Sequence, residues 1–372
     1  MAKERDPEVV ARTMEKKRLK EERKRLKLEQ KAQKKEAKKR AKELADQEAE
    51  LEEEGSNIPI FLTTVAIVGI WLLILCILIK TLLYYYISVK MKMQEVTPLK
   101  NIAVINDISG FGKCSLTVSL PIISALGLEC NPIPTAILSN QTGYDDFHSV
   151  DFTENMTPYI DVWKKQNVHF DAILTGYLAS EKQVDIIIDF IDTFGDNSLV
   201  FVDPVMADDG VLYDTYDEQL CNKVKMLTKK ANIITPNLTE LCILCGADYN
   251  EISKENDVEK ISSLAFSLLN ETTKTVVVTG IKNNDEIINL IVDKSGAKPV
   301  KSKLLKGSYS GTGDIFSSIV CGAVTKGMDV FNAVTLATNF ISQSIKSTPT
   351  NLDYEPDGVN FQKHLEMLVN AE

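Results

Sequence analysis

The segment that decides the fold of this chain is Gly307–Ser318, with the sequence GSYSGTGDIFSS. Its Gly-Thr-Gly-Asp sequence at 311–314 leads directly into the small and apolar residues 315–325, a composition that predicts a helix. Two glycines let the backbone approach a ligand closely, and the N–H groups at a helix N-terminus attract an anion. Asp is also common in the first turn of ordinary helices, and no Gly-Lys-Ser/Thr follows as in a Walker A loop. The motif therefore predicts either a phosphate site or only a capped turn.

Upstream of this segment, short β-rich runs recur, and a helical stretch follows most of them. Apolar strands that are buried on both faces and alternate with helices predict a parallel sheet covered by helices. Two further runs, Asn284–Val292 and Lys301–Leu305, predict a hairpin before the final helices. The predicted parallel strands are Asn101–Asn106, Pro134–Leu138, Asp171–Thr175, Leu199–Asp203, Asn232–Thr235 and Thr275–Thr279.

Polar residues follow five of these runs at the point where each strand is expected to end. Because ligands of open parallel sheets bind beyond the carboxyl ends of the strands, we expect the functional site at this edge. The residues concerned are Asn106-Asp107, Thr175-Gly176-Tyr177, Asp203-Pro204, Thr235-Pro236-Asn237 and Thr279-Gly280.

Five motifs in order carry a resemblance to a known family. The 311–314 motif, Asp203-Pro204-Val205-Met206 and the 234–240 segment (ITPNLTE) together resemble the ribokinase superfamily. Within it, LSNQTGY at 138–144 and LTGY at 174–177 resemble the pyridoxal kinases, especially bacterial pyridoxamine/pyridoxal kinases. The similarity extends from about Lys100 to Val369. It implies an α/β fold, a ribokinase-like three-layer sandwich with a central mostly parallel sheet.

The resemblance also implies a reaction, in which the γ-phosphoryl group of ATP moves to the 5′-hydroxymethyl group of pyridoxal, pyridoxamine or pyridoxine. This step would salvage vitamin B6 as pyridoxal phosphate. Phosphoryl transfer depends mostly on positioning and charge neutralisation. We expect Asp314 to act as the general base, with the amides of Gly311, Thr312 and Gly313 receiving the charge that spreads over the transferred group.

The implied cofactors are ATP and Mg²⁺, and K⁺ is left open. Asp203 and Glu240 resemble the acidic pair that organises Mg²⁺ in this family, through waters. Asn237, Thr279 and Gly280, together with Gly311 and Gly313, are the expected ATP contacts. Thr235 and Thr279 resemble positions near the phosphates and a monovalent cation.

Thr142 and Tyr177 resemble the family's contacts to the substrate ring, with Tyr144 behind them, and we assign Asp107 as a further ring contact. An aromatic face stacks on a π-deficient ring, and a hydroxyl fixes a ring substituent. Residues 208–213 resemble the segment that closes over bound substrate. Two departures matter, because residues 106–110 (NDISG) replace the Gln-Ser-His of many pyridoxal kinases and Gln141 replaces a His. Both favour the sister hydroxymethylpyrimidine kinases, which remain the alternative.

The first 94 residues do not belong to that family, and they predict two different segments. Residues 1–57 form a charged arm of strong helix formers, for which an exposed single helix is favoured over a coiled coil. Residues 58–94 contain Ile58–Ile79, a run of 22 without charge, which meets the roughly 20 residues needed to cross a bilayer. The three-tyrosine sequence at 84–86 follows as an interfacial belt would. We therefore predict one transmembrane helix before a kinase domain at 95–372.

Orientation follows from the substrate, since ATP lies inside the cell. A membrane-anchored, single-pass kinase facing the cytoplasm would leave the basic arm outside, against the tendency of positive segments to remain inside. The kinase would be simply cytoplasmic if residues 1–94 come from an atypical fusion.

Charge and cysteine usage exclude several classes of protein. Residues 95–372 carry a net charge of −16, which is unsuited to binding nucleic acid. A single CxxC pair, Cys242 and Cys245, and three His in the chain argue against a disulfide scaffold or zinc site. A non-catalytic membrane scaffold with a kinase-like body stays as an alternative, and a homodimer is left open.

Overall fold

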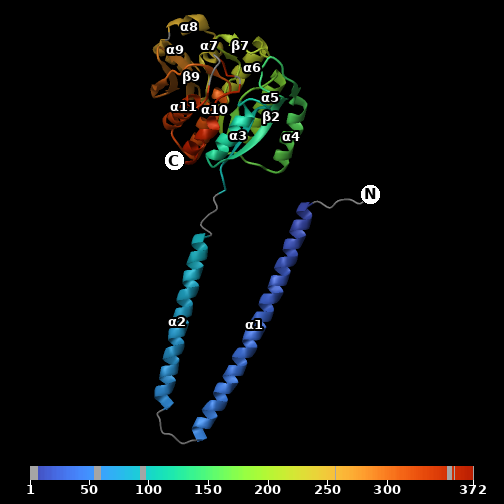
Figure 1. The fold of residues 1–372 in the computed structure, drawn as a ribbon, viewed down its shortest axis with the longest axis vertical. Coiled ribbons are helices and arrows are strands. Elements are labelled where there is room, and N and C mark those ends of the chain that lie inside the picture. Colours follow the sequence, from blue (N-terminus) through green and yellow to red (C-terminus); the bar gives the residue numbers. More distant parts are fainter. Residues whose placement is uncertain are drawn as a thin grey trace, which may run out of the picture. The chain divides into compact units, whose positions relative to one another are not determined.

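The computed structural model describes residues 7–53, 60–92, 98–255, 257–349, 354–355 and 357–371. The chain divides into two compact units, Met1–Val96 and Thr97–Glu372 (Figure 1).

The first unit contains α1, Pro7–Glu53, a continuous charged helix as its composition predicts. Every side chain of α1 whose exposure is described is exposed. Arg40 and Lys39 pair with Glu36 and Glu43 one turn away, at N–O distances of 3.2 and 3.6 Å. Exposed pairs of this kind stabilise a helix by only a few tenths of a kcal/mol each, roughly.

The second helix of this unit is α2, Ile60–Lys92. Its window Gly69–Tyr86 has a mean hydropathy of 1.9 and is not buried, so by length and composition alone it could cross a membrane. Among the described residues it is the one helix that meets this test. The start of the predicted span, at 58 and 59, lies outside the described residues.

The second unit is built on a nine-stranded sheet within the described residues, in the order β11-β10-β9-β8-β5-β4-β1-β2-β3. The six strands from β9 to β2 are parallel to their neighbours, while β3, β10 and β11 are antiparallel additions at the edges. The expected parallel sheet and the late hairpin, β10–β11, are therefore confirmed. The strands are β1 Asn101–Ser109, β2 Glu129–Leu138, β3 Ser149–Asp151, β4 Ala172–Thr175, β5 Leu199–Val202, β8 Ile233–Ile234, β9 Thr275–Asn283, β10 Glu286–Asp293 and β11 Gly296–Lys303.

Helices cover both faces of this sheet, and each face has its own apolar cluster. Successive β1 residues show why: Ala103 and Ile105 belong to one cluster and Ile102 and Val104 to the other, all at most 1% exposed. The three-layer α/β sandwich is thus confirmed. One layer holds α4 Thr153–Lys165, α5 Glu181–Phe194, α6 Glu218–Thr228, α7 Leu238–Cys245, α8 Tyr249–Glu255 and α9 Val258–Ser267, and the other α3 Leu116–Ala125, α10 Thr312–Lys326, α11 Val330–Lys346, η1 Phe361–His364 and α12 Glu366–Val369.

Two small ladders lie outside the main sheet. Strand β12, Ser308–Tyr309, pairs in parallel with β13, Tyr354–Glu355. Strands β6, Ala207–Asp208, and β7, Val211–Leu212, form a hairpin. Its central residues Asp209 and Gly210 both have positive φ, 43° and 85°, as the tight two-residue hairpin turn requires.

Candidate active site

The Gly-Thr-Gly-Asp turn forms the N-terminus of α10, as predicted. Gly311 is the N-cap with φ 75°, and a Cβ there would lie 1.9 Å from the carbonyl oxygen of Lys113. The loop before α3 therefore packs directly on this glycine. A Cβ built on Gly313 meets no atom within 4 Å, so the other glycine faces open space. One side of the turn is held by the fold, and the other side is accessible to a ligand.

Asp314 lies in the first turn of α10 and is joined to the end of β1. Its Oδ1 accepts a hydrogen bond from Asn106 Nδ2 at 2.9 Å. Burial raises the pKa of Asp314 to about 6, and the charge of Asp107 adds to that rise, while the Ser115 backbone N–H and Asn106 oppose it. A carboxylate with a pKa close to neutrality is well suited to general-base catalysis.

Asn106 and Asp107 are both buried, and the pairing of β1 with β2 shifts its register between Asn106 and Ile108. The extra residue lies on β2, between Pro134 and Ile137, so the bulge is in the strand beside Asn106. Asp107 accepts hydrogen bonds from Ser109 Oγ at 2.9 Å and Ser115 Oγ at 2.6 Å. Burial raises its pKa, and these two hydroxyls partly offset the effect.

The predicted substrate residues lie on three segments, the first of which is β1 with Asp107. Tyr177 follows β4, and its hydroxyl bonds Thr215 Oγ1 at 3.0 Å. Thr142 is exposed and Tyr144 is half-buried in the loop after β2. The Tyr144 ring lies 5.7 Å from that of Phe111, between centroids, and its hydroxyl donates to Asp357. The structure thus joins Asp107 and Tyr177 through Asn106, and it holds Tyr144 against the loop that follows β1.

The predicted acidic pair forms a buried group of carboxylates with Asp314. Burial and the charge of Asp314 raise the pKa of Asp203, and burial and the charge of Asp203 raise that of Glu240. Glu240 is fixed by a capping box with Asn237 at the start of α7. Its Oε2 accepts the Asn237 N–H at 2.8 Å and its Oε1 the Met206 N–H at 3.1 Å. Both oxygens of Glu240 are therefore already oriented by backbone donors.

This group of acids suits a hard divalent cation. The carboxylates repel one another, and the buried hydroxyl of Thr175 has no hydrogen-bond partner. Thr235 lies close enough to Asp203 to lower the pKa of that acid. Within the described part of the chain, no three His, Cys, Asp or Glu side chains form a ready metal cluster. A cation here would complete its shell with waters and phosphate oxygens, as Mg²⁺ commonly does.

Three of the predicted nucleotide residues, Asn237, Thr279 and Gly280, come from the start of α7 and the interior of β9, which extends past the expected strand end at Thr279 to Asn283. Asn237 and Thr279 form a parallel bridge, and the Thr279 N–H donates to Pro236 O at 2.9 Å. Asn237 Nδ2 donates to Ala207 O at 2.7 Å, which links it to the β6–β7 hairpin. Gly280 has φ 71° and open space where a Cβ would stand. The two segments thus meet beside the acids.

The β6–β7 hairpin corresponds to the predicted closing segment, and its tip contacts α7, α8 and β9. The Gly210 N–H donates to Thr239 Oγ1 at 2.9 Å, and Asp209 pairs with Lys282 at 3.1 Å. A Cβ on Gly210 would lie 2.7 Å from the Tyr249 ring. Burial raises the pKa of Tyr213, and the charge of Glu240 adds to this, so the base of the hairpin borders the acidic group.

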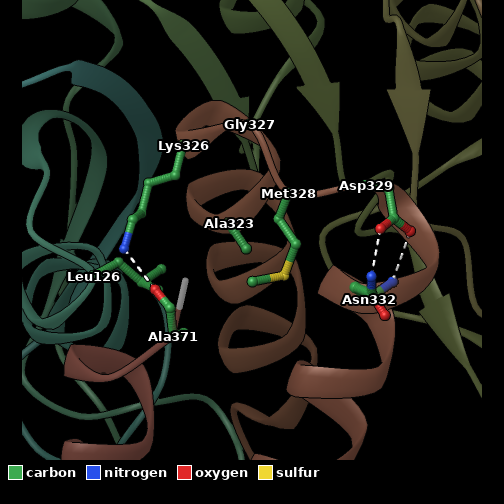
Figure 2. A pocket seen from close by; sticks show the side chains of 8 residues that line it. All are labelled: Leu126, Ala323, Lys326, Gly327, Met328, Asp329, Asn332 and Ala371. Atoms are coloured by element: carbon green, nitrogen blue, oxygen red, sulfur yellow. Dashed lines mark hydrogen bonds between the residues drawn. The ribbon is translucent and has the colours of Figure 1, made fainter.

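A separate cavity of about 340 Å³ lies at the C-terminal end of α10 (Figure 2). There Lys326 Nζ donates to Ala371 O at 2.8 Å, beside Met328 and the Asp329 cap of α11. The 15 residues of α10 span about 22 Å at the rise of an α-helix. The cavity is therefore remote from Asp314 and is not part of this site.

Comparison with known proteins gives the family. Residues 120–357 match the family model described as phosphomethylpyrimidine kinase. The chain belongs to this kinase family. It is consequently a phosphotransferase that uses ATP, and its fold and the kinase part of the predicted resemblance are confirmed. Residues 1–96 lie outside the matched region.

Relatives of this kinase act on two kinds of ring. A Bacteroides thetaiotaomicron protein, provisionally named a phosphomethylpyrimidine kinase and crystallised with pyridoxal, is 35% identical with a TM-score of 0.69, covering 74% of this chain and 97% of its own. The pyridoxine/pyridoxal/pyridoxamine kinase of Bordetella avium is 27% identical over 64% of this chain and 82% of its own length. A hydroxymethylpyrimidine/phosphomethylpyrimidine kinase of Staphylococcus aureus is 31% identical over 48% and 63%. The family thus covers vitamin B6 or pyrimidine substrates.

Two contacts of the site were not predicted from the sequence. Asn106 was noted only as a strand-end residue, yet it bonds Asp314 and the Tyr177 backbone. The Ser115 N–H, which also lowers the pKa of Asp314, was not identified. The polar pair directly after the first strand was the available signal for Asn106, whereas nothing in the sequence distinguishes Ser115.

Proposed function

We propose that this kinase transfers the γ-phosphoryl group of ATP to the 5′-hydroxymethyl group of a B6 vitamer. The observation that carries the proposal is the direct link from Asp314 through Asn106 to the Tyr177 backbone. This link supports the proposal that Asp314, whose pKa is raised by burial to about 6, is the general base near Tyr177. The relative crystallised with pyridoxal supports the same substrate class.

In the proposed reaction, Asp314 accepts the proton of the substrate hydroxyl as its oxygen attacks the γ-phosphorus. The new O–P bond forms while the bond to the β-phosphate oxygen breaks, and ADP leaves. The amides of Gly311, Thr312 and Gly313, together with the N-terminus of α10, attract the charge on the transferred oxygens. Asn237, Thr279 and Gly280 are proposed to contact the nucleotide. Thr142 and Tyr144, in the loop after β2, are proposed to flank the ring with Asp107 and Tyr177.

The residues proposed to hold Mg²⁺ are Asp203 and Glu240, through waters. When bound, the ion would neutralise phosphate charge. The hydroxyl of Thr175, which lacks a partner, would gain one there. Stimulation by K⁺ is tested by varying the KCl concentration in the assay. Pairing into a homodimer is tested by light scattering.

Hydroxymethylpyrimidine is the second candidate substrate. The bonded trio of Asp107, Ser109 and Ser115 favours it, because this Asp-x-Ser-Gly pattern resembles the sister family and the matched family model carries its name. In both cases Asp314 would serve the same role.

The deciding experiment measures ADP release by the purified full-length chain. Pyridoxal, pyridoxine, pyridoxamine and hydroxymethylpyrimidine are supplied separately with ATP and Mg²⁺. We expect turnover with at least one B6 vitamer and its loss in Asp314→Asn. Turnover with hydroxymethylpyrimidine alone would transfer the function to the second candidate. Unchanged ATP turnover in Asp314→Asn would favour the non-catalytic scaffold.

We further propose that α2 anchors the kinase as a single membrane span, with the three domains 1–57, 58–94 and 95–372 expected from the sequence. ATP use requires the kinase domain to face the cytoplasm, which leaves the basic arm outside. This placement is tested by adding protease to the outside of sealed vesicles that keep the orientation of the cell membrane. Protection of the arm from the protease would refute the placement. Recovery of the chain in the soluble fraction would indicate a cytoplasmic protein.

A further inference from the structure

Asn106 connects three elements at the carboxyl edge of the sheet. It lies on β1 where the register with β2 shifts, and it is 4% exposed. Its Nδ2 donates to Asp314 Oδ1 at 2.9 Å, and its Oδ1 accepts the N–H groups of Tyr177 at 2.9 Å and Asp107 at 3.0 Å. One side chain therefore contacts the start of α10, the residue after Gly176 and its own strand.

The orientation of this amide follows from its partners. Backbone N–H groups can only donate, so the atom that accepts both must be the Asn106 oxygen. The amide nitrogen must then face Asp314. Gly176 holds the side chain from behind, because even a Cβ there would lie 2.4 Å from Asn106 Nδ2. The donor pointed at the carboxylate is thus a fixed feature of the fold.

We propose that Asn106 is a positioning residue for the general base, fixing Asp314 Oδ1 with a donated hydrogen bond so that the other carboxylate oxygen receives the substrate proton. This inference rests on the proposed role of Asp314 as base. Because the same amide holds the Tyr177 N–H, it also sets the distance between the base and the proposed ring contact.

Several charged or titratable groups face Asp314, and Asn106 is the side chain that opposes their effect. Asp107 on β1 raises the pKa of Asp314. Asp203 after β5, Cys114 before α3 and Tyr213 after β7 lie close enough for the charge of Asp314 to raise their own pKa values. A donor that favours the ionised carboxylate keeps Asp314 able to accept a proton among these neighbours.

The test compares Asn106→Ala and Asn106→Asp with the wild-type full-length chain over pH 5–9. Asn106→Ala removes the donor, so we expect kcat to fall about 100-fold, the loss typical of a misplaced catalytic group. We also expect the acid limb of kcat/KM to move up by about one pH unit, the usual size of a lost charge-stabilising contact. Asn106→Asp keeps the shape and both accepted N–H bonds, and it guards against failure of the Ala variant to fold. In this variant the carboxyl groups at positions 106 and 314 titrate as a coupled pair, and the higher of their two apparent pKa values should also rise.

A merely structural role would lower the rate equally at every pH. Asn232→Ala is the matched control, because Asn232 Oδ1 also accepts a backbone N–H, from Val200 at 2.8 Å, but at the opposite ends of the strands. The acid limb of kcat/KM for Asn232→Ala should lie at the same pH as that of the wild type. An unmoved limb in both Asn106 variants would overturn the inference while leaving the proposed function intact.

A second readout does not depend on turnover. The carboxyl carbon signal of Asp314, assigned by its loss in Asp314→Asn, is titrated by ¹³C NMR in the wild type and in both Asn106 variants. An upward shift of its midpoint supports the inference even if no B6 vitamer is phosphorylated. An unchanged midpoint overturns it, whichever substrate the enzyme uses.

Discussion

Gly176 offers the sharpest test of how closely the strand ends must approach. It directly follows β4, its N–H donates to Ile105 O at 2.8 Å, and its φ is not in the left-handed region. Gly176→Ala is therefore compatible with the backbone and acts by steric contact alone. The new Cβ would lie 2.4 Å from Asn106 Nδ2, about 1 Å inside ordinary van der Waals contact, where carbon atoms pack at about 3.5 Å.

Asn106 must move to relieve this contact, and Asp314 loses its partner or moves with it. Overpacking of this kind costs about 1–3 kcal/mol of unfolding free energy, and a displacement of about 1 Å at the base costs roughly 100-fold in kcat. Urea unfolding and steady-state kinetics measure the two effects separately. A variant with the kcat of the wild type would refute the reasoning, since the link from Asn106 to Asp314 would then be dispensable.

Gly322→Ala provides the matched control on α10. Its Cβ would lie 2.5 Å from Leu126 Cδ1, so it also overpacks the domain, but toward the end of the helix remote from Asp314. We expect a comparable or smaller loss of stability with an unchanged kcat. Loss of activity in both variants would indicate that general destabilisation, and not the position of Asn106, limits the rate.

Four further predictions concern Asp314 and Glu240. Asp314→Asn should lower kcat by about 10²–10⁴-fold, the usual contribution of a general base, with ATP affinity by calorimetry little changed; a loss of binding instead would point to a structural defect. The acid limb of kcat/KM should lie near pH 6, since Asp314 must be ionised and burial raises its pKa to about 6. Because the fold raises the pKa of Asp314, folding favours the protonated acid, and the free energy of unfolding of the wild type should fall as pH rises from about 4 to 6. The Tm of Asp314→Asn relative to that of the wild type should therefore rise across this window. A Tm difference that stays constant with pH would contradict the prediction. The Glu240→Gln side chain can accept only one of the two N–H groups, from Asn237 or Met206. Urea unfolding should therefore show a loss of about 1–3 kcal/mol in the free energy of unfolding, and the assay should need more Mg²⁺. Wild-type values of both quantities would remove Glu240 from the site.

The fold was predictable from the sequence because its signals are local. The runs ending at Leu138 and Thr175 are apolar, short and followed by helical sequence, and they became β2 and β4. The Gly-Thr-Gly-Asp turn at 311–314 indicated the start of α10 by its glycines and its small residues. The CxxC pair, Cys242 and Cys245, lies on α7.

The contacts among the site residues were less accessible, because they depend on register and on partners far along the chain. Asn106 bonds Asp314, which lies 208 positions further along the chain, from a point where the register of β1 with β2 shifts. Glu240 was expected beside a metal ion, yet the reciprocal capping box that fixes its two oxygens requires the Met206 backbone as well. Such geometry cannot be deduced from residue types, even where the residues themselves are correctly chosen.

The place where the chain enters the sheet has a mechanical consequence. β1 is an interior strand, bonded in parallel to β2 on one side and β4 on the other. Two hydrogen bonds hold the start of β1: Lys100 Nζ donates to Thr325 O at 2.7 Å, and the Asn101 N–H donates to Asp171 Oδ2 at 2.8 Å. A force that pulls on β1 through residues 1–96 would act first on these two hydrogen bonds. It would also act in shear on the pairing of β1 with β2 and β4 before it reached Asn106. These contacts would therefore shield Asn106 from a force applied at the start of β1.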